Sequence, residues 1–214
     1  MLEIKKLQVN IGTANILREV ELSVPSGSLT GLIGRNGAGK TTLMRCVMGL
    51  LQSKAGAIAF DGAHLDTVPA HARVSLGIGY MPEDRRLVPD FTVEDNVLVP
   101  AWAAQLDGAP DRLEWVYGLM PEVKDFRDRR ANQLSGGQQK LVALARALMA
   151  GRKLLLLDEP FEGVAPALAQ RLAEVLSDLK KTGVSLLVAE SNEKHIAHLL
   201  SEMHVIERGA IHRA

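Results

Sequence analysis

Hydrophobic residues follow two patterns in the first quarter of the chain, an alternating one and a helical one. Segments 2–9 and 16–24 alternate roughly between apolar and polar side chains, which predicts two strands. The short apolar run 29–33 ends at a glycine and predicts a buried strand, and segment 41–51 carries apolar residues at helical spacing. A strand, a glycine loop and a helix are therefore expected in succession.

From about residue 92 to residue 150 the strand patterns disappear and only helical ones remain. Before and after this stretch strands alternate with helices, which is typical of a parallel sheet with helices on its faces. We predict one α/β domain, with residues 1–90 and 151–214 as its core and residues 91–150 as a helical insertion. The remaining predicted elements are strands 57–61, 78–81, 153–157, 184–189 and 203–206, and helices 69–76, 93–104, 111–119, 138–149, 167–180 and 193–200.

The composition fits a globular protein in a reducing compartment. Hydrophobic residues make up 47% of the 214 residues, which is enough to bury a core. The 25 basic and 25 acidic side chains balance, so net charge gives no reason to expect nucleic acid as a partner. The single cysteine, Cys46, excludes an internal disulfide framework, and no apolar run reaches the roughly 18 residues of a membrane span. We expect a cytoplasmic protein that reaches a membrane only through a partner.

Residues 34–42, with the sequence GRNGAGKTT, match the glycine-rich loop that binds phosphate groups. The glycines let the backbone curl so that several N–H groups point at phosphate oxygens, beside the positive end of the following helix. Lys40 supplies a charge for the β- and γ-phosphates, and Thr41 offers a hydroxyl to Mg²⁺. A glycine-rich turn with a surface lysine is the alternative, but the strand before and the helix after favour phosphate binding. The loop residues expected to bind a nucleotide are Asn36, Gly37, Ala38, Gly39, Lys40, Thr41 and Thr42.

The apolar run 154–157 ends in two carboxylates, Asp158 and Glu159. A parallel sheet places such residues at its carboxyl edge, beside the phosphate loop. Asp158 suits the hydration shell of Mg²⁺, and Glu159 suits a general base that polarises the attacking water. A strand that stops at a solvated acidic turn is the alternative, and the phosphate loop in the same chain argues against it.

A third motif, LSGGQQ at residues 134–139, precedes a predicted helix. A serine and two glycines at the start of a helix leave N–H groups free, so this segment can bind an anion. On these residues alone, a helix cap without a ligand is the more common arrangement.

Together, the three motifs resemble in kind and in order the ATP-binding subunit of an ABC transporter, over essentially the whole chain. The resemblance implies a P-loop NTPase core with a mixed or parallel sheet, an N-terminal antiparallel β portion and an inserted helical subdomain. It also implies that two such subunits hold two ATP molecules between them. The residues that would contact the nucleotide held by the other subunit are Ser135, Gly136, Gly137 and Gln138. The implied partners are a second ATPase subunit, transmembrane permease subunits and, indirectly, a solute-binding protein.

Three segments resemble more narrowly the ATPases of branched-chain amino acid importers (the LivF-like group). These are residues 81–87, MPEDRRL, residues 91–96, FTVEDN, and residues 162–166, EGVAP. Many ABC ATPases have glutamine where Glu83 stands, and either side chain can reach Mg²⁺ or its water through an oxygen. The resemblance implies import of branched-chain or other amino acids, or of a related small solute.

The chain departs from the general ABC pattern at two site positions. Ile11 stands where an aromatic ring usually stacks on adenine, so base packing lacks the aromatic contribution of roughly 0.5–1.5 kcal/mol. Ser191 stands at the position of the switch histidine; its hydroxyl can hydrogen-bond to the γ-phosphate but cannot carry a positive charge. His195 lies one helical turn further on, where a packed or solvated histidine is the simpler interpretation.

Two functions from different classes fit this sequence. The first is an ATP-hydrolysing subunit that drives a membrane permease. The second is a soluble ABC-type ATPase that acts on DNA or ribosomes, or a nucleotide-gated regulatory module with little turnover. Such soluble proteins usually carry two cassettes or long coiled-coil insertions, and this chain shows neither, so the transporter subunit is preferred.

Overall fold

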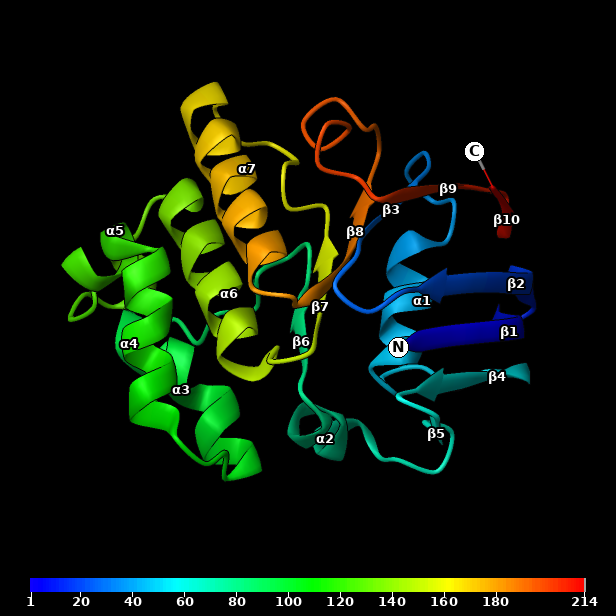
Figure 1. The fold of residues 1–214 in the computed structure, drawn as a ribbon, viewed down its shortest axis with the longest axis horizontal. Helices are drawn as coiled ribbons and strands as arrows, with labels where there is room; N and C mark the ends of the chain where they lie inside the picture. The colour runs from blue at the N-terminus through cyan, green and yellow to red at the C-terminus, as the bar shows by residue number, and fades with distance from the viewer. Residues whose placement is uncertain (214) are drawn as a thin grey trace.

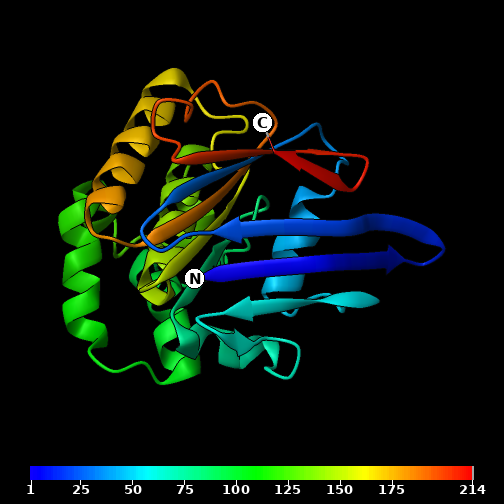
Figure 2. The same cartoon turned by 45° about the vertical axis from the view of Figure 1, so that its right-hand side comes forward.

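The computed structural model describes residues 1–213 and contains two β-sheets with helices packed around them (Figure 1). The smaller sheet is antiparallel, has the strand order β2-β1-β4-β5, and forms the side of the molecule away from most helices (Figure 2). Its strands are β1 (Leu2–Ile11), β2 (Ala14–Val24), β4 (Ala55–Phe60) and β5 (Ala63–His64).

The larger sheet has six strands in the order β10-β9-β3-β8-β7-β6. Five neighbouring strands run parallel, and β10 pairs antiparallel to β9 at the edge. Its strands are β3 (Leu29–Ile33), β6 (Ile78–Met81), β7 (Leu154–Asp158), β8 (Ser185–Glu190), β9 (Glu202–Glu207) and β10 (Ala210–Arg213). The predicted α/β fold with a mixed sheet and an N-terminal antiparallel portion is confirmed.

Helices cover both faces of the larger sheet. In Figure 1, α1 lies between the two sheets, α6 and α7 lie on the opposite face, and α3, α4 and α5 lie beyond α6. The helices are α1 (Lys40–Val47), α2 (Ala70–Arg73), α3 (Val93–Ala104), α4 (Ala109–Leu119), α5 (Pro121–Asp125), α6 (Gly136–Ala150) and α7 (Pro166–Lys181), with short 3₁₀ turns η1 (Val74–Leu76) and η2 (Ala131–Gln133). Among residues 1–213, none of the helices is long and apolar enough to cross a membrane.

Strand β7 shows why the central strands are continuously apolar. Leu155 and Leu157 point into the core shared with α6 and α7, whereas Leu154 and Leu156 point into the core shared with α1 and the smaller sheet. All four side chains are fully buried. Successive strand residues face opposite sides, so a strand covered on both faces has no solvent-facing position for a charged side chain. The first polar side chains after such a run stand at the edge of the sheet.

One predicted element is wrong: residues 193–200 form turns instead of a helix. The apolar positions Ile196, Leu199 and Leu200 have helical spacing, but the amide of Leu199 bonds to the carbonyl of Ile196, an i→i+3 turn. The amide of Ser201 already pairs with the carbonyl of Leu29, where the chain enters β9. Although Ala197 and Leu200 each donate to the carbonyl four residues before them, these bonds do not continue into a regular helix.

The division into a core and a helical subdomain at residues 91–150 stays a prediction. Helices α3 to α6 do lie between β6 and β7 in the chain, as expected. Their apolar side chains, however, belong to the same continuous core as those of β7, β8 and α7. No separate apolar core marks a boundary between the two parts.

Arg73, at the end of α2, fastens the C-terminal end of α1 to the chain around it. Its guanidinium donates to the carbonyls of Cys46 and Val47 at 2.9 and 2.7 Å, and to those of Leu65 and Val68 at 2.6 and 2.9 Å. The last carbonyls of a helix lack partners within the helix, and a cation is favourable there. Arg73 is buried and therefore replaces solvent as the donor to four carbonyl groups.

We expect Arg73→Met to lower the free energy of unfolding by about 3 kcal/mol, because four buried carbonyls lose a charged donor. Urea denaturation measures the change. Arg18→Met is the matched control, since Arg18 is exposed, and it is expected to cost less than about 0.5 kcal/mol. Equal stability of the two variants would contradict the assigned role of Arg73.

Candidate active site

Three strand ends bring the predicted chemistry to one edge of the larger sheet. Strand β3 leads into the phosphate loop, β7 ends at Asp158, and β8 ends at Glu190. The register aligns these ends, because Ile33 pairs with Glu190 and Asp158 pairs with Ala189. Ligands of open α/β sheets bind at this carboxyl edge. The carboxyl edge is therefore the candidate active site.

The loop after β3 turns sharply into α1, and its glycines are required by the backbone. Gly39 precedes α1 with φ 113°, and a Cβ there would lie 2.7 Å from Leu17 Cδ2. A Cβ on Gly34 would lie 2.4 Å from the carbonyl oxygen of Ile206. A side chain at either position would therefore clash, and Gly39 would also be strained. Lys40 is the first residue of α1, so its charge adds to the positive end of the helix.

A cavity of about 330 Å³ opens at this loop. It brings together residues of the phosphate loop with Glu83 from the segment after β6 and Glu159 from the segment after β7. Ile11, at the end of β1, lines it and is half exposed, which leaves its side chain available to pack on a flat group. The lining residues are Ile11, Ile16, Asn36, Gly37, Gly39, Lys40, Thr41, Thr42, Glu83 and Glu159. Ala38 is buried beneath the loop.

Lys40 and Glu159 form a buried ion pair at the floor of the site. The distance from Lys40 Nζ to Glu159 Oε1 is 2.8 Å, and the two side chains are 4% and 5% exposed. Lys40 Nζ also donates to the carbonyl oxygens of Gly34 and Arg35. Glu159 has a left-handed backbone, with φ 51°. An uncommon conformation at a non-glycine residue is held in place by its surroundings and is often found at functional sites.

Ser191 contacts Glu159 and Asn36. Its hydroxyl lies 3.0 and 3.2 Å from the two carboxylate oxygens of Glu159, and 2.9 Å from Asn36 Oδ1. Its backbone N–H also donates to Glu159 Oε2 at 3.2 Å. A hydroxyl donates one hydrogen bond at a time, so Ser191 is shared between the carboxylate and the loop. These contacts orient Glu159; direct contact of Ser191 with a phosphate stays a prediction.

Asp158 is fully buried beside Thr41. Its Oδ1 accepts from Thr41 Oγ1 at 3.1 Å, and its Oδ2 accepts from Tyr80 OH at 3.2 Å. Burial raises the pKa of Asp158 above its usual range, and the two hydroxyl donors oppose that rise. A carboxylate and a hydroxyl this close, beside the phosphate loop, match the oxygen ligands that Mg²⁺ prefers. Within the described residues no three His, Cys, Asp or Glu side chains could hold a metal by themselves. A Mg²⁺ ion at Asp158 and Thr41 would therefore need further oxygen ligands, such as those of phosphate and water.

Glu83 lines the cavity from the segment that follows β6. Its pKa is raised by burial and by the nearby carboxylates of Glu162, Asp158 and Glu159. Four carboxyl groups thus lie near one another at this edge of the sheet, and Lys40 forms an ion pair with one of them, Glu159. A divalent cation would relieve this repulsion, which is the electrostatic reason to retain Glu83 among the candidate metal contacts.

The LSGGQ motif, residues 134–138 of the LSGGQQ segment, lies away from this cavity, at the start of α6. Ser135 caps the helix, since its hydroxyl accepts from the amide of Gln138 at 3.3 Å. The side chain of Gln138 accepts from the amide of Ser135 at 3.0 Å, which completes a capping box. Arg85 donates to the carbonyl of Gly136 at 3.1 Å. None of residues 135–138 lines the phosphate-loop cavity. Their contact with a nucleotide held by another subunit stays a prediction.

Sequence reasoning missed three residues that touch the site or its supports, namely Tyr80, Lys140 and Glu190. Glu190 follows an apolar strand just as Asp158 does, so the same rule would have found it. Tyr80 and Lys140 carry no such signal, because one aromatic in a strand and one lysine in a helix are common. His195, in contrast, is packed as expected, with its ring stacked on Phe161 at a centroid distance of 5.2 Å.

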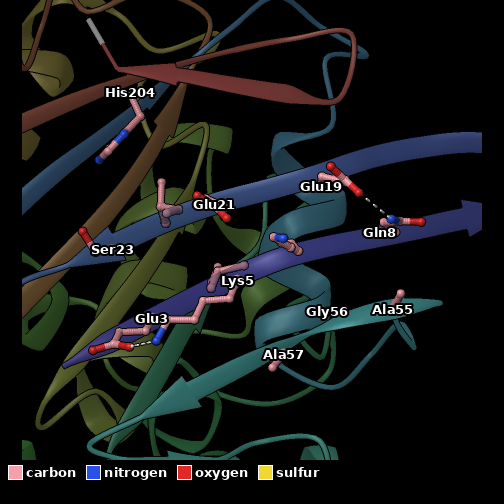
Figure 3. Close-up of a pocket in the computed structure, with 13 residues that line it drawn as sticks. Glu3, Lys5, Gln8, Glu19, Glu21, Ser23, Ala55, Gly56, Ala57 and His204 are labelled. Atoms are coloured by element: carbon pink, nitrogen blue, oxygen red, sulfur yellow. Dashed lines mark hydrogen bonds and ion pairs between the residues drawn. The ribbon is translucent and has the colours of Figure 1, made fainter.

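A larger cavity, of about 850 Å³, lies on the outer face of the smaller sheet, away from the phosphate loop (Figure 3). Two pairs of its polar side chains contact each other: Glu3 lies 3.0 Å from Lys5, and Gln8 donates to Glu19 at 3.4 Å. Both pairs are exposed to solvent. Cavity size therefore does not identify the active site. The phosphate loop and the candidate general base line the smaller cavity.

The fold and the site together define a cassette that binds and hydrolyses ATP. The family model described as ABC transporter matches residues 17–162, and the chain belongs to this family. The resemblance to the ATP-binding subunit of an ABC transporter is thereby confirmed, and the enzyme is an ATPase.

Relatives of known name span nearly the whole chain. The high-affinity branched-chain amino acid transport ATP-binding protein BraG of Pseudomonas aeruginosa is 35% identical over 99% of this chain and 91% of its own length. The lipopolysaccharide export system ATP-binding protein LptB of Escherichia coli is 34% identical over 91% of this chain and 84% of its own. Among solved structures, the ADP conformation of an ATP-binding cassette of an ABC transporter has a TM-score of 0.85 at 26% identity, covering 100% of this chain and 91% of that one.

We expect the free energy of unfolding of Glu190→Gln, relative to that of the native chain, to increase as pH rises. Burial, with the adjacent Glu159 carboxylate, raises the pKa of Glu190 to about 8, against the opposing effects of the Phe161 amide and Lys140. An acid whose pKa is higher in the folded state costs stability as pH rises from its unfolded to its folded pKa. Between pH 5 and 9 the variant should gain on the order of 3 kcal/mol relative to the native chain. Urea denaturation at both pH values measures this gain, and Glu21→Gln, at an exposed position of β2, is the comparison; a constant difference would contradict the burial of the charge.

Proposed function

We propose that this chain is the ATPase subunit of an importer for branched-chain or other amino acids, or for a related small solute. The observation that carries the ATPase part is the cavity that joins the phosphate loop to the Lys40–Glu159 pair. The cargo rests on names of relatives, of which two concern branched-chain amino acid transport. The relatives that serve lipopolysaccharide export make an exporter the second candidate.

The phosphate loop binds the triphosphate through backbone N–H groups at residues 36–42 and through the Lys40 ammonium. Lys40 now donates to Glu159 and to the carbonyl of Arg35. The γ-phosphate gives this ammonium a stronger anionic partner, so Glu159 Oε1 becomes available to a water molecule. Ile11 and Ile16 border the same cavity and offer apolar surface to the base.

Thr41, Asp158 and Glu83 would hold Mg²⁺ with the phosphates. When bound, this ion neutralises charge on the β- and γ-phosphates. Tyr80 holds the second oxygen of Asp158, so the first oxygen keeps one direction, toward Thr41. Fixed ligands of this kind cost little reorganisation during the reaction.

Glu159 acts as the general base. Its carboxylate takes a proton from water, the water oxygen bonds to the γ-phosphorus, and the bond to the bridging β-γ oxygen breaks to leave ADP and inorganic phosphate. Ser191 donates to both oxygens of this carboxylate in turn and fixes its direction. Lys40 balances charge as it accumulates on the γ-phosphate.

A second ATPase subunit completes the pocket. Ser135, Gly136 and Gly137 expose the start of α6, whose N–H groups can bind the γ-phosphate of a nucleotide held by that subunit. Gln138 holds Ser135 in place through the capping box. Whether the second subunit is a copy or a paralogue, transmembrane permease subunits and an external solute-binding protein would form the rest of the importer, with this subunit on the cytoplasmic face of the membrane.

We expect Lys40→Ala to weaken ATP binding roughly 100-fold or more, because the loop loses its only buried cation for the phosphates. Titration with a fluorescent ATP analogue measures the affinity, and thermal unfolding checks that the fold survives the loss of the ion pair with Glu159. Lys5→Ala removes an exposed lysine and serves as the control. Native affinity in Lys40→Ala would place the triphosphate elsewhere.

Glu159→Gln should bind ATP but hydrolyse it about 1,000-fold more slowly, and should therefore accumulate an ATP-bound dimer. Phosphate release measures turnover, and size-exclusion chromatography with ATP measures the dimer. Glu162→Gln, on the same turn, is the control that retains the base. Native turnover in Glu159→Gln would require another base.

The cargo is tested with the complete transporter. The chain is co-expressed with candidate permease subunits from the same genome and reconstituted into liposomes with a candidate solute-binding protein. ATP-dependent uptake of labelled leucine, abolished by Glu159→Gln, is the expected result. ATP-dependent extraction of lipopolysaccharide would instead support the exporter, and ATP binding without hydrolysis beside the permeases would support a regulatory module.

A further inference from the structure

Lys140 is a buried cation in α6 that no step of the proposed reaction uses. Lys140 is only 6% exposed, and the next two residues, Leu141 and Val142, are buried and apolar. Burial lowers the pKa of Lys140, and three neighbouring carboxyl groups oppose that decrease. An ammonium in such a position is costly unless it is fully hydrogen-bonded, so its partners indicate its role.

The partners of Lys140 lie on the turn that carries the general base. Lys140 Nζ donates to the carbonyl oxygen of Glu159 at 2.8 Å and to that of Glu162 at 2.6 Å. On the same turn Glu190 Oε1 accepts from the amide of Phe161 at 2.8 Å. The turn is therefore held from α6 by one side chain and from β8 by another. The left-handed backbone of Glu159 depends on this support.

Lys140 also stands close to the LSGGQ motif along α6. It follows Gly136 by four residues and Gly137 by three, so the three positions share one side of the helix. At a rise of 1.5 Å per residue, Lys140 lies about 6 Å along the axis from Gly136. One rigid helix thus carries the exposed anion site at its start and the attachment to the base one turn further on.

We propose that Lys140 is a positioning residue for ATP hydrolysis, which fixes the direction of the Glu159 carboxylate by holding the 159–162 turn against α6. Lys140 thereby connects two contacts of α6. The N-terminus of the helix contacts the nucleotide of a second subunit, and Lys140 holds the turn with the base that acts on the nucleotide of its own chain. The second part rests on the proposed function, because it requires the dimer. An apolar residue at position 140 would fill the space but leave two carbonyls without this donor.

Arg112 provides a matched comparison at the other end of α6. It donates from α4 to the carbonyls of Leu148 and Gly151, at 2.8 and 3.1 Å through Nη2. It therefore fastens α6 by the same kind of contact, but far along the helix from the base. Loss of this contact should affect stability without affecting the chemistry.

The test compares Lys140→Met, Lys140→Arg and Arg112→Met by urea denaturation, by kcat and by KM for ATP. Lys140→Met is expected to lower kcat about tenfold or more with KM within about threefold, since a displaced base slows chemistry without touching the phosphate loop. Lys140→Arg keeps the cationic donors and should recover most of kcat, which covers the case in which Lys140→Met folds poorly. Arg112→Met should lose stability yet retain kcat per folded subunit. Native kcat in Lys140→Met, or equal losses of kcat in Lys140→Met and Arg112→Met, would overturn the proposal.

A second measurement separates this role from simple support of the LSGGQ motif. In the Glu159→Gln background, which reports dimer formation without hydrolysis, Lys140→Met should leave the ATP-dependent dimer intact. Loss of that dimer would show that Lys140 supports the motif and would overturn the proposal. If Glu159→Gln alone formed no ATP-dependent dimer or kept native turnover, the proposed function itself would fail, and this outcome is distinct from a native kcat in Lys140→Met.

Discussion

The buried contact between the Lys40 ammonium and the Glu159 carboxylate, at 2.8 Å, is the interaction on which the site depends. Each charge would be costly in this position without the other, since desolvation of a single buried ion exceeds any one hydrogen bond. Together they bring the start of α1 and the end of β7 into one small volume. The same contact holds the Lys40 ammonium, the proposed phosphate-binding charge, next to the Glu159 carboxylate, the proposed base.

The apolar strands around this pair explain why the charges gather there. β7 and β8 are buried on both faces, so neither strand can carry a charged side chain before its carboxyl end. Asp158, Glu159 and Glu190 then follow at one edge, where burial first, and the neighbouring Glu159 carboxylate second, raise the pKa of Asp158 and of Glu190. Lys40 and Lys140 lie on opposite sides of this acidic group, one at the start of α1 and one in α6. Two cations on two different helices thus stabilise one acidic edge.

The sequence was sufficient to predict the phosphate loop, the two carboxylates after β7 and most of the strands along the chain, because glycine spacing and hydrophobic periodicity are local signals. It failed at residues 193–200, where the spacing of Ile196, Leu199 and Leu200 suits a helix but the chain forms turns before Ser201 pairs with Leu29. It also missed Arg73 and Lys140, whose roles depend on carbonyls from distant segments. A pattern along the chain contains no information about such carbonyls until the fold brings them together.

The two helix ends of this chain that are predicted to bind an anion, at Lys40 and at Ser135, do not share a cavity. One triphosphate in the phosphate loop therefore leaves the start of α6 without its anion. A two-fold arrangement of two subunits resolves this, because an isologous interface lets each subunit supply one helix end to each of two sites. In the proposed dimer each α6 then contacts the nucleotide of the other subunit at its first turn and its own Glu159 turn through Lys140. The rigid part between the two sites would be a single turn of helix, which is short enough to transmit a displacement without unfolding.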